Sequence, residues 1–384
     1  MARWRKLLPF RELTIPLKMA AAAVVNRGRA ITPFRELDLP HGSLRLVDGV
    51  PLVRVRGTPL EMGRALGTLV GVQAAEVFQH YMGFFAPDRD GDLALARQMQ
   101  PQLPQWFTDE MTGFSQTSEL TADDLLLGQT FLDIHTVALC STLAAHGSAT
   151  VDGELLLGRN LDFPGLSIAH QANIVVVYEP AGGRPYAGVT WPGFLGILTG
   201  LNAAGLALSM MLVYGQSRHE HLRGQPFPLV FRRLLHECAD VPPALALLEQ
   251  RPWCTATNLM IADSGRRAAR LQLHPKGAVV DQTTPEHPTL ACTNHYLQRR
   301  LRSFAFTWFS SVLRLSRLHK HIRRGPLDVQ GVKDALQATG MPGLNLQRVL
   351  MRPERLEMEV AFEDLGRGPG RWVRLPREML FPGL

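Results

Sequence analysis

The sequence predicts an α+β protein in which helices come first and antiparallel strands follow. Two observations predict this order. Helix-start signals dominate the chain before Cys140, whereas short apolar runs separated by turn residues dominate after it. Helical pattern then returns in the second half, so helices are available to cover the strands.

Two helix starts are marked in the first part of the chain. Thr58-Pro59-Leu60-Glu61 places threonine at the N-cap, proline at the first helical position and glutamate three residues after the cap. Helical spacing continues to about Met82. Thr121, with Asp124 three residues on, opens a second helix that runs to about His135. We therefore expect residues 1–139 to be mostly helical.

Strands are expected from Cys140 onward, as hairpins. Apolar runs flank turn residues repeatedly, which is typical of a meandering antiparallel sheet. The paired runs are Cys140–Ala145 with Glu154–Arg159, Ile174–Tyr178 with Tyr186–Thr190, Leu195–Leu201 with Leu206–Val213, and Asn258–Ala262 with Ala268–Leu273. Helical pattern returns at Phe227–Gln250 and Ser310–Arg324, and two last strands are expected at Leu346–Met351 and Leu356–Phe362.

One stretch, from Pro185 to Ser217, has no charged residue and is long enough to span a bilayer. Glycines interrupt it, and the Asn202–Gly205 turn divides it into short apolar runs. Strands that are buried on both faces are continuously apolar, so the stretch predicts a buried hairpin and no transmembrane segment.

Composition places the chain among ordinary globular proteins. Its 384 residues are 46% apolar and 20% charged, which excludes disordered and collagen-like classes. The length allows two or three domains or one large layered domain. The net charge is +7, but the densest basic cluster, from Arg299 to Arg324, is typical of a solvated helix face. No docking motif accompanies the charge, so nucleic acid is not an expected partner.

Cysteine usage and the N-terminus bear on the cellular address. The four cysteines form no C-x-x-C pair, so neither a zinc site nor a disulfide framework is expected: they are Cys140, Cys238, Cys254 and Cys292. The first residues are cationic and end in the apolar stretch Met19–Val25, which is short for a signal peptide. We expect residues 1–50 to be a basic leader, and the localisation stays unknown, with the cytoplasm slightly favoured over export.

Cys140 lies where the helical pattern ends and the strand pattern begins. A lone cysteine in an apolar context is usually a small core residue, so this position alone is weak evidence. The strand expected to pair with it ends in Gly158-Arg159-Asn160-Leu161-Asp162-Phe163. In a hairpin the end of the second strand lies beside the start of the first, so we expect Cys140, Arg159 and Asp162 to converge. An Arg and an Asp beside a turn are also common as a surface ion pair.

These residues resemble the N-terminal nucleophile hydrolases of the penicillin-acyltransferase and choloylglycine-hydrolase type, which are related to acid ceramidase and phospholipase B-like proteins. The most specific part is Cys140-Ser141-Thr142 followed by a turn and the segment G-R-N-L-D-F. Further similar motifs follow the family order: they are Gly57–Gly63, Trp191–Gly196, Thr199–Leu206 and Thr293-Asn294-His295. The resemblance spans roughly Val55 to Phe362.

The resemblance implies a fold and a division of the chain. The family fold is a four-layer αββα sandwich with two stacked antiparallel sheets between helices. Residues 51–139 would be a helical propeptide region, and residues 140–384 the catalytic region. The precursor would cleave itself between Leu139 and Cys140, and the processed chains would stay associated.

By this resemblance, Cys140 carries both catalytic groups. Its thiol attacks an acyl carbon, and its freed α-amine, whose ordinary pKa is about 8, acts as the general base. Asp162 would orient that amine, and Arg159 would lie near the sulfur and favour the thiolate. Asn294 would donate its side-chain amide to the oxyanion, although it could instead be a turn residue after a strand.

Further residues are assigned to substrate. Arg314 resembles the later active-site arginine of the family, while Arg317 lies one helical turn away and fits nearly as well; both could simply belong to a basic helix face. Trp191 and Phe194 are expected to bind substrate, with Met211 as another apolar pocket residue.

The expected function is that of a self-processing cysteine hydrolase or acyltransferase that acts on an amide bond through a Cys140 acyl-enzyme. Small-molecule or lipid-like acyl amides or esters are the expected substrates. No metal or organic cofactor is implied. If the donor is a thioester and the acceptor an amine, coenzyme A would be a co-substrate. Bile-salt hydrolysis is not expected, because the second asparagine of the choloylglycine branch is replaced here by Met210-Met211-Leu212.

Three alternatives stay open. A lipid-acting amidase or esterase, phospholipase B-like or ceramidase-like, fits the basic surface and the apolar pocket residues. An unprocessed, non-catalytic binding protein would remain one chain with an unreactive Cys140. A Cys-His enzyme would pair Cys140 with His295, His170 or His146.

Overall fold

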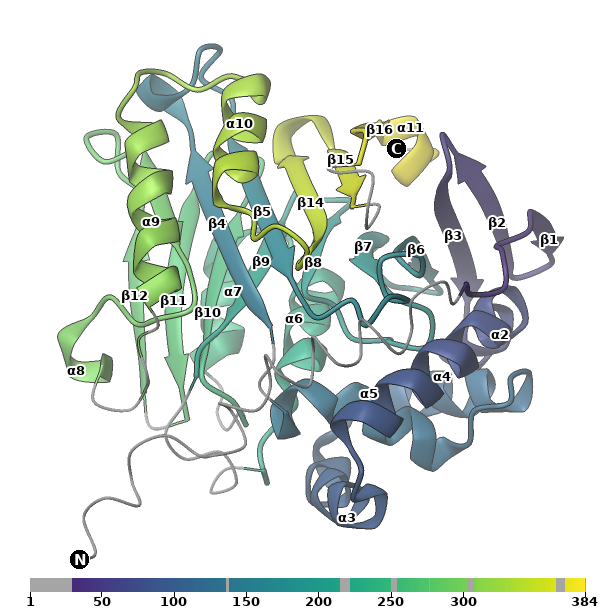
Figure 1. Cartoon of the computed structure of the whole chain (residues 1–384). Coiled ribbons are helices and arrows are strands. Elements are labelled where there is room, and N and C mark those ends of the chain that lie inside the picture. The colour runs from purple at the N-terminus through teal and green to yellow at the C-terminus, as the bar shows by residue number, and fades with distance from the viewer. Residues whose placement is uncertain are drawn as a thin grey trace, which may run out of the picture.

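The computed structural model describes residues 30–135, 138–214, 222–249, 254–275, 277–302, 305, 307, 309–363 and 370–383. Residues 1–29, which include most of the expected leader, lie outside the described residues. Two sheets stack face to face in the middle of the molecule, and helices cover their outer faces (Figure 1). This is the α+β, αββα arrangement that the sequence predicts.

The larger sheet has ten strands in the order β1-β2-β3-β6-β7-β8-β9-β10-β11-β12. Their bounds are Leu37–Leu39, Gly42–Val47, Val50–Gly57, Ile174–Pro180, Tyr186–Thr190, Thr199–Asn202, Ala207–Leu212, Thr257–Ala262, Ala268–His274 and Gly277–Gln282. Neighbours run antiparallel except β3 and β6, which are parallel. The sheet is therefore not wholly antiparallel, because a strand from the first part of the chain is added beside a strand from the second.

The smaller sheet has six strands, all antiparallel, in the order β13-β4-β5-β14-β15-β16. Their bounds are Thr289–Cys292, Leu139–Ala145, Leu156–Asp162, Asn345–Arg352, Glu357–Phe362 and Val373–Leu375. The expected hairpin of β4 and β5 is confirmed, with Cys140 opposite Leu161 and Leu139 opposite Asp162.

The helices fall into two groups. The first group comes before the strand β4: α2 (Pro59–Phe85), α3 (Arg89–Met99), α4 (Gln105–Gln116) and α5 (Ala122–Ile134). The second group follows it: α6 (Phe227–Glu237), α7 (Val241–Glu249), α8 (Arg299–Arg302), α9 (Phe309–Ile322), α10 (Val329–Thr339) and α11 (Arg377–Leu380). The short 3-10 turns of the described residues are η2 (Gln100–Gln102), η3 (Gly147–Ala149) and η4 (Pro353–Arg355).

Contacts between these elements define the layers. Helices α9 and α10 cover the smaller sheet, whose other face packs on the larger sheet through β4 against β9 and β10. Thr142 Oγ1 and Ser209 Oγ are hydrogen-bonded across the two sheets at 2.9 Å. On the far face, α6 packs on β8 and α2 packs on β2 and β3. The core lies between the sheets and beneath these helices.

The two marked helix starts are confirmed, because each threonine forms a capping box. Glu61 N–H donates to Thr58 Oγ1 at 3.4 Å and Thr58 N–H donates back to Glu61 Oε2 at 2.7 Å. Thr121 and Asp124 make the same reciprocal pair. Each box satisfies backbone donors that the first helical turn leaves without a partner.

Several elements differ from the expected ones. Strands β1, β2 and β3 occur where no strand was predicted, so residues 37–47 of the expected leader belong to the larger sheet. The single helical pattern from Phe227 to Gln250 is divided into α6 and α7, since Pro242 and Pro243 cannot continue the first helix and suit the start of the second. Helix α10 was not expected.

The strand expected at Leu195–Leu201 is shorter in the structure, where β8 begins at Thr199. The preceding loop turns at Gly193, whose φ of +78° favours glycine. A side chain satisfies the loop backbone in place of a strand: Gln129 of α5 donates to Gly193 O at 2.7 Å and accepts from Leu195 N–H at 2.8 Å. The charge-free stretch, as far as Tyr214, forms β7, β8 and β9, and within the described residues no helix is both long and apolar enough to cross a membrane.

A fully buried ion pair joins the first group of helices to the second. Arg232 of α6 donates to both carboxylate oxygens of Glu110 on α4, at 2.9 and 2.5 Å, and both side chains have no exposed surface. The guanidinium carbon also lies 4.2 Å from the ring centre of Tyr178 and 5.1 Å from that of Trp106. The residues before and after Cys140 are thus held together through the core.

Candidate active site

Cys140 is fully buried near the start of β4, and its side chain faces the space between the two sheets. Its hydrogen bonds join it to three predicted site residues. Arg159 Nη2 donates to Cys140 Sγ at 3.3 Å, and Cys140 N–H donates to Asn294 Oδ1 at 2.7 Å. Arg314 Nη1 donates to the carbonyl oxygen of Cys140. The sulfur, the backbone nitrogen and the backbone oxygen of one residue are therefore each bound by a different side chain.

Arg159 reaches the sulfur from the neighbouring strand. It lies on β5 opposite Thr142, so its side chain shares the inner face of the sheet with Cys140. Its other terminal nitrogen, Nη1, donates to Thr199 Oγ1 on β8 of the opposite sheet. Burial raises the pKa of the Cys140 thiol, while the Arg159 guanidinium opposes that rise. The hairpin of β4 and β5 thus places Arg159 beside Cys140, as the sequence predicts.

Asp162 lies at the end of β5 and is buried. Its Oδ1 accepts hydrogen bonds from Met341 N–H at 2.9 Å and Asn345 Nδ2 at 2.8 Å. Its Oδ2 lies 3.7 Å from Arg314 Nη1 and has no hydrogen-bond partner among the described residues. Burial raises the pKa of this carboxyl, and Arg314 opposes the rise.

Asn294 joins the nucleophile to helix α9. Its Oδ1 accepts from both Cys140 N–H and Arg314 Nη2, each at 2.7 Å. Its Nδ2 donates to Leu212 O at 2.7 Å and to Ala138 O at 3.5 Å. Its amide oxygen, and not its NH₂ group, therefore binds the Cys140 backbone N–H.

The structure brings Arg314 to the site and leaves Arg317 on the surface. Arg314 is 3% exposed and contacts Cys140, Asn294 and Asp162. Arg317 is exposed and donates to the backbone oxygen of Ala338. One helical turn thus separates a residue of the site from a residue of the solvated face.

A small hydroxyl network that the sequence analysis missed fixes Asn294. Ser311 Oγ accepts from Asn294 N–H at 2.9 Å and lies 2.8 Å from His295 Nδ1, and it donates to Thr293 Oγ1 at 2.9 Å. Thr293 Oγ1 in turn donates to Ser311 O. Helical spacing could have found Ser311, because it lies three residues before Arg314 and so on the same face of α9.

The histidines proposed for a Cys-His enzyme have other surroundings. His295 Nδ1 is next to Ser311 and Thr293, and burial lowers the pKa of this imidazole to about 4. His146 follows the far end of β4 from Cys140. His170 lines another pocket, together with Pro33, Phe34, Leu46, Gly49, Pro51, Gln171, Asn173, Phe362 and Glu363.

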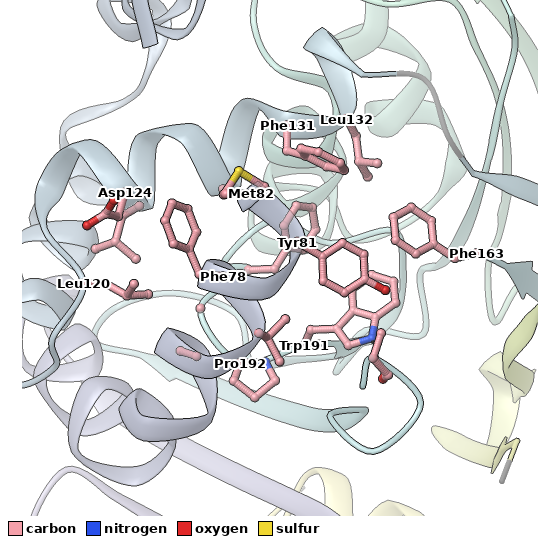
Figure 2. Close-up of a pocket in the computed structure, with 17 residues that line it drawn as sticks. Phe78, Tyr81, Met82, Leu120, Asp124, Phe131, Leu132, Phe163, Trp191 and Pro192 are labelled. Atoms are coloured by element: carbon pink, nitrogen blue, oxygen red, sulfur yellow. Dashed lines mark hydrogen bonds between the residues drawn. The ribbon is translucent and has the colours of Figure 1, made fainter. Parts of the chain in front are cut away.

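An apolar pocket lies beside the site and contains both predicted substrate residues. Helices α2 and α5 and the loop of Trp191 and Phe194 form its walls, with about 650 Å³ of open volume including the solvent at its mouth (Figure 2). Phe163, the residue after Asp162, also lines it. Asp124 is the charged residue of the lining. Met211, which was expected to belong to such a pocket, is buried in β9 and is not among the residues that line this one.

No group of three or more His, Cys, Asp or Glu among the described residues could hold a metal ion. The four cysteines are buried and free. The groups gathered at this site are a thiol, two guanidinium groups, a carboxyl and an amide.

Comparison with known proteins identifies relatives of part of the chain. Protein dcd1A of Dictyostelium discoideum is 25% identical over 231 residues, which cover 51% of this chain and 52% of that protein. The N-acylethanolamine-hydrolyzing acid amidase of Cavia porcellus is 30% identical over 107 residues, 28% of each chain. The chain spans about half the length, or less, of the curated relatives that it matches.

Solved structures with a similar arrangement include the Caenorhabditis elegans ortholog of N-acylethanolamine-hydrolyzing acid amidase. It matches with a TM-score of 0.45 and 17% identity, over 56% of this chain and 93% of that chain.

The family comparison covers most of the candidate site. Residues 149–334 match the family model described as acyl-coenzyme A:6-aminopenicillanic acid acyl-transferase. The matched span begins after Cys140 and includes Arg159, Asp162, Asn294 and Arg314. Residues 149–334 are therefore similar to this acyl-transferase family, which confirms the predicted resemblance to the penicillin-acyltransferase type of N-terminal nucleophile hydrolase.

Proposed function

We propose that the chain is a self-processing cysteine hydrolase or acyltransferase that acts on amide bonds through an acyl-enzyme on Cys140. The arrangement around Cys140 carries this proposal: Arg159 donates to its sulfur, while Asn294 and Arg314 bind its backbone groups. Nucleophilic catalysis needs an activated nucleophile and fixed charged or polar groups around the reacting atoms. Strand β5, helix α9 and the segment after β13 place such charged and polar groups around Cys140, which supports the proposal.

In the processing step, the Cys140 thiol attacks the carbonyl carbon of Leu139. The peptide C–N bond breaks, a thioester forms between Leu139 and the sulfur, and the thiol proton passes to the departing amine. Water then hydrolyses the thioester, which leaves a carboxylate on Leu139 and a free thiol and α-amine on Cys140. Arg159 stabilises the developing thiolate, against the burial that raises the thiol pKa.

In turnover, the freed amine removes the thiol proton while the sulfur attacks the acyl carbon of the substrate. The substrate C–N bond breaks, the amine leaves with that proton, and water or a second amine then takes the acyl group from the thioester. Asp162 orients the Cys140 amine. Its Oδ2 has no hydrogen-bond partner among the described residues, and a cationic amine would satisfy it.

Asn294 is assigned to the oxyanion. Its Nδ2 lies 3.5 Å from Ala138 O in the uncleaved chain. When cleavage frees the end of the first segment, Ala138 can leave and this donor becomes available for the substrate oxyanion. Losing one such donor typically costs on the order of 100-fold or more in rate.

The proposed catalytic region is residues 140–384, and residues 51–139 are the proposed propeptide. We expect the two processed chains to stay associated, because β3 is paired with β6 inside the larger sheet and Glu110 is paired with Arg232 in the core. Breaking a buried ion pair is costly when one charge is left without its partner.

A lipid-like acyl group is the favoured substrate part, because the pocket beside Asp162 is apolar over most of its lining. Such a pocket gains free energy from each methylene that it removes from water. This supports a lipid-acting amidase or esterase as the second candidate function. A coenzyme A thioester can form the same acyl-enzyme and remains a proposed co-substrate for transfer.

The test is the intact mass of the purified protein, with N-terminal sequencing of any fragments. We expect two chains from the unaltered protein, the second beginning Cys140-Ser141-Thr142, and one chain from Cys140→Ala. Cys238→Ala, which changes another buried cysteine, is the matched control and should process normally. One uncleaved chain in every sample would contradict self-processing and favour the non-catalytic binding protein.

A further inference from the structure

Helix α9 has two faces of opposite character. Its inner face, which includes Ser311 and Arg314, is buried against the site. On its outer face Phe309 is 75% exposed, Val312 43% and Leu313 40%. Positions three and four apart are neighbours on a helix surface, so these three side chains form one apolar patch. A contiguous exposed patch with an aromatic ring indicates an interaction site more than scattered apolar residues do.

Cations surround this patch, and the segment lacks carboxylates. From His287 to Leu327 the sequence has no Asp or Glu. The exposed cations of α8, α9 and the turn after α9 are Arg299, Arg300, Arg302, Arg317, Lys320, Arg323 and Arg324. Within the described part of the chain, no carboxylate lies at ion-pair distance from any of them.

The contacts that these cations make leave their charge uncompensated. Arg300 donates to Ala278 O and Arg302 donates to Leu297 O. A carbonyl oxygen binds a guanidinium without neutralising it. The surface therefore presents fixed positive charge beside an apolar patch.

We propose that this surface, formed by α8 and the outer face of α9, docks on a membrane that carries anionic lipids. An amphipathic helix with apolar side chains and basic neighbours binds the lipid interface through apolar burial and attraction to anionic headgroups. The charge argues for this partner over a second copy of the chain, because two copies would bring like charges together. The apolar patch argues for lipid over nucleic acid, whose phosphate backbone gives Phe309, Val312 and Leu313 nothing apolar to pack against.

Docking through α9 would bring the candidate active site close to the membrane surface. Helices α8 and α9 lie together at one margin of the molecule, on the left in Figure 1. Ser311, two residues after Phe309, binds the backbone of Asn294, which binds Cys140. The patch therefore lies at the end of α9 that reaches the site. If the proposed lipid-like substrate is right, docking brings the site to its substrate, but the docking itself does not depend on that chemistry.

The first experiment measures partition of the full chain onto vesicles of phosphatidylcholine with or without phosphatidylserine. We expect binding to the vesicles with phosphatidylserine that weakens as salt is raised. The triple variant Phe309→Ser, Val312→Ser, Leu313→Ser should lower the partition coefficient about 10-fold or more, since the buried apolar area is lost. Val72→Ser, which changes an exposed apolar residue of α2, is the control and should bind as the unaltered chain does.

A second pair of variants separates local charge from net charge. The double variant Arg317→Glu, Lys320→Glu should lower vesicle binding strongly. The double variant Arg56→Glu, Arg377→Glu changes the net charge by the same amount at other exposed positions and should retain most of the vesicle binding. Equal losses in the two pairs would overturn the proposal. Three other results would also overturn it: the unaltered chain does not bind vesicles, it binds duplex DNA tightly and not vesicles, or it forms a dimer that the triple serine variant cannot form.

Discussion

At the scale of single residues, the site depends on Asn294, which is held through both its side-chain oxygen and its backbone N–H. Asn294 Oδ1 accepts from the Cys140 N–H and from Arg314 Nη2, and Asn294 N–H donates to Ser311 Oγ. Ser311 and Arg314 lie on the same face of α9, so this helix fixes both ends of the asparagine. Ser311 is thus a positioning residue, since it acts on Cys140 through Asn294.

A comparison of two arginines on α9 tests this arrangement. Arg314→Gln should slow self-processing by about 100-fold, because it removes the charged donor from the Cys140 carbonyl oxygen and from Asn294. Arg317→Gln should process at the normal rate, because that side chain is exposed. The measurement is the rate at which the second chain appears after synthesis, followed by mass, with thermal melting to confirm that both variants fold. Equal rates in the two variants would rule out this role for Arg314.

Sequence could predict part of this site but not the choice between these arginines. Cys140, Arg159 and Asp162 were expected to meet because hairpin geometry alone places the ends of paired strands together. Arg314 and Arg317 fit the helical pattern equally, and only the packing of α9 on the smaller sheet turns one of them inward. Ser311 shares a helical face with Arg314, so spacing could identify it once Arg314 is assigned to the site, whereas the Thr293 hydroxyl has no such signal.

At the scale of elements, Asp133 stands at the junction of α5 and α6, in the last turn of the helix that leads to Cys140. Its Oδ1 accepts from Thr255 Oγ1, and it also accepts from the backbone N–H of Phe227 at the start of α6. Its Oδ2 has no partner among the described residues. Burial raises the pKa of this carboxyl to about 7, and the two hydrogen bonds only partly oppose that rise.

This pKa predicts a pH dependence of stability with a definite sign. The unfolded carboxyl has a pKa of about 4, so the native state binds the proton more tightly than the unfolded state does. Its stabilising contribution is complete below about pH 4 and is lost as the pH rises to about 7. Asp133→Asn stays neutral and should remove this slope, which amounts to as much as about 4 kcal/mol. Urea unfolding across this pH range measures it.

The control for that experiment is Asp123→Asn, a half-exposed carboxylate in the first turn of the same helix. Asp133 stays in place in this variant, so the slope assigned to Asp133 should persist. If Asp133→Asn keeps the full slope of the unaltered chain, the carboxyl does not titrate as its burial implies.

Among the elements, those with a local signal could be predicted. The capping boxes at Thr58 and Thr121 confirm this, because their geometry needs only four consecutive residues. The hairpin of β2 and β3 also carries such a signal, since Asp48 and Gly49 both have positive φ, at 47° and 85°, between alternating apolar residues. This hairpin was not predicted because its first strand and its turn lie within residues that were assigned to a leader. The short β8 could not be predicted, because a side chain from α5 replaces its ladder.

At the scale of the whole molecule, the first part of the chain is more than an appendage to the second. It adds three strands to the larger sheet, supplies Glu110 to the core and builds two walls of the apolar pocket. The pocket could be predicted only through Trp191 and Phe194, which lie within the family-like motif Trp191–Gly196. Phe78, Tyr81 and Phe131 come from helices whose packing against that loop no local pattern specifies.

The pocket predicts that acyl-chain length can be changed from α5. Gly128 lines it, and a Cβ atom added there would meet only Phe78, at 3.9 Å, so the position tolerates a side chain. Gly128→Leu should fill the pocket and raise KM for long-chain acyl amides about 10-fold or more, because a few methylenes of apolar contact are lost, while short-chain substrates keep their KM. The measurement is KM and kcat across a series of acyl lengths. Gly83→Leu makes the same change at an exposed position of α2 and should leave the whole series unaltered. An unchanged length profile in Gly128→Leu would exclude this pocket as the acyl site and return the choice of substrate to small acyl groups, because the lipid-like candidate rests on this cavity.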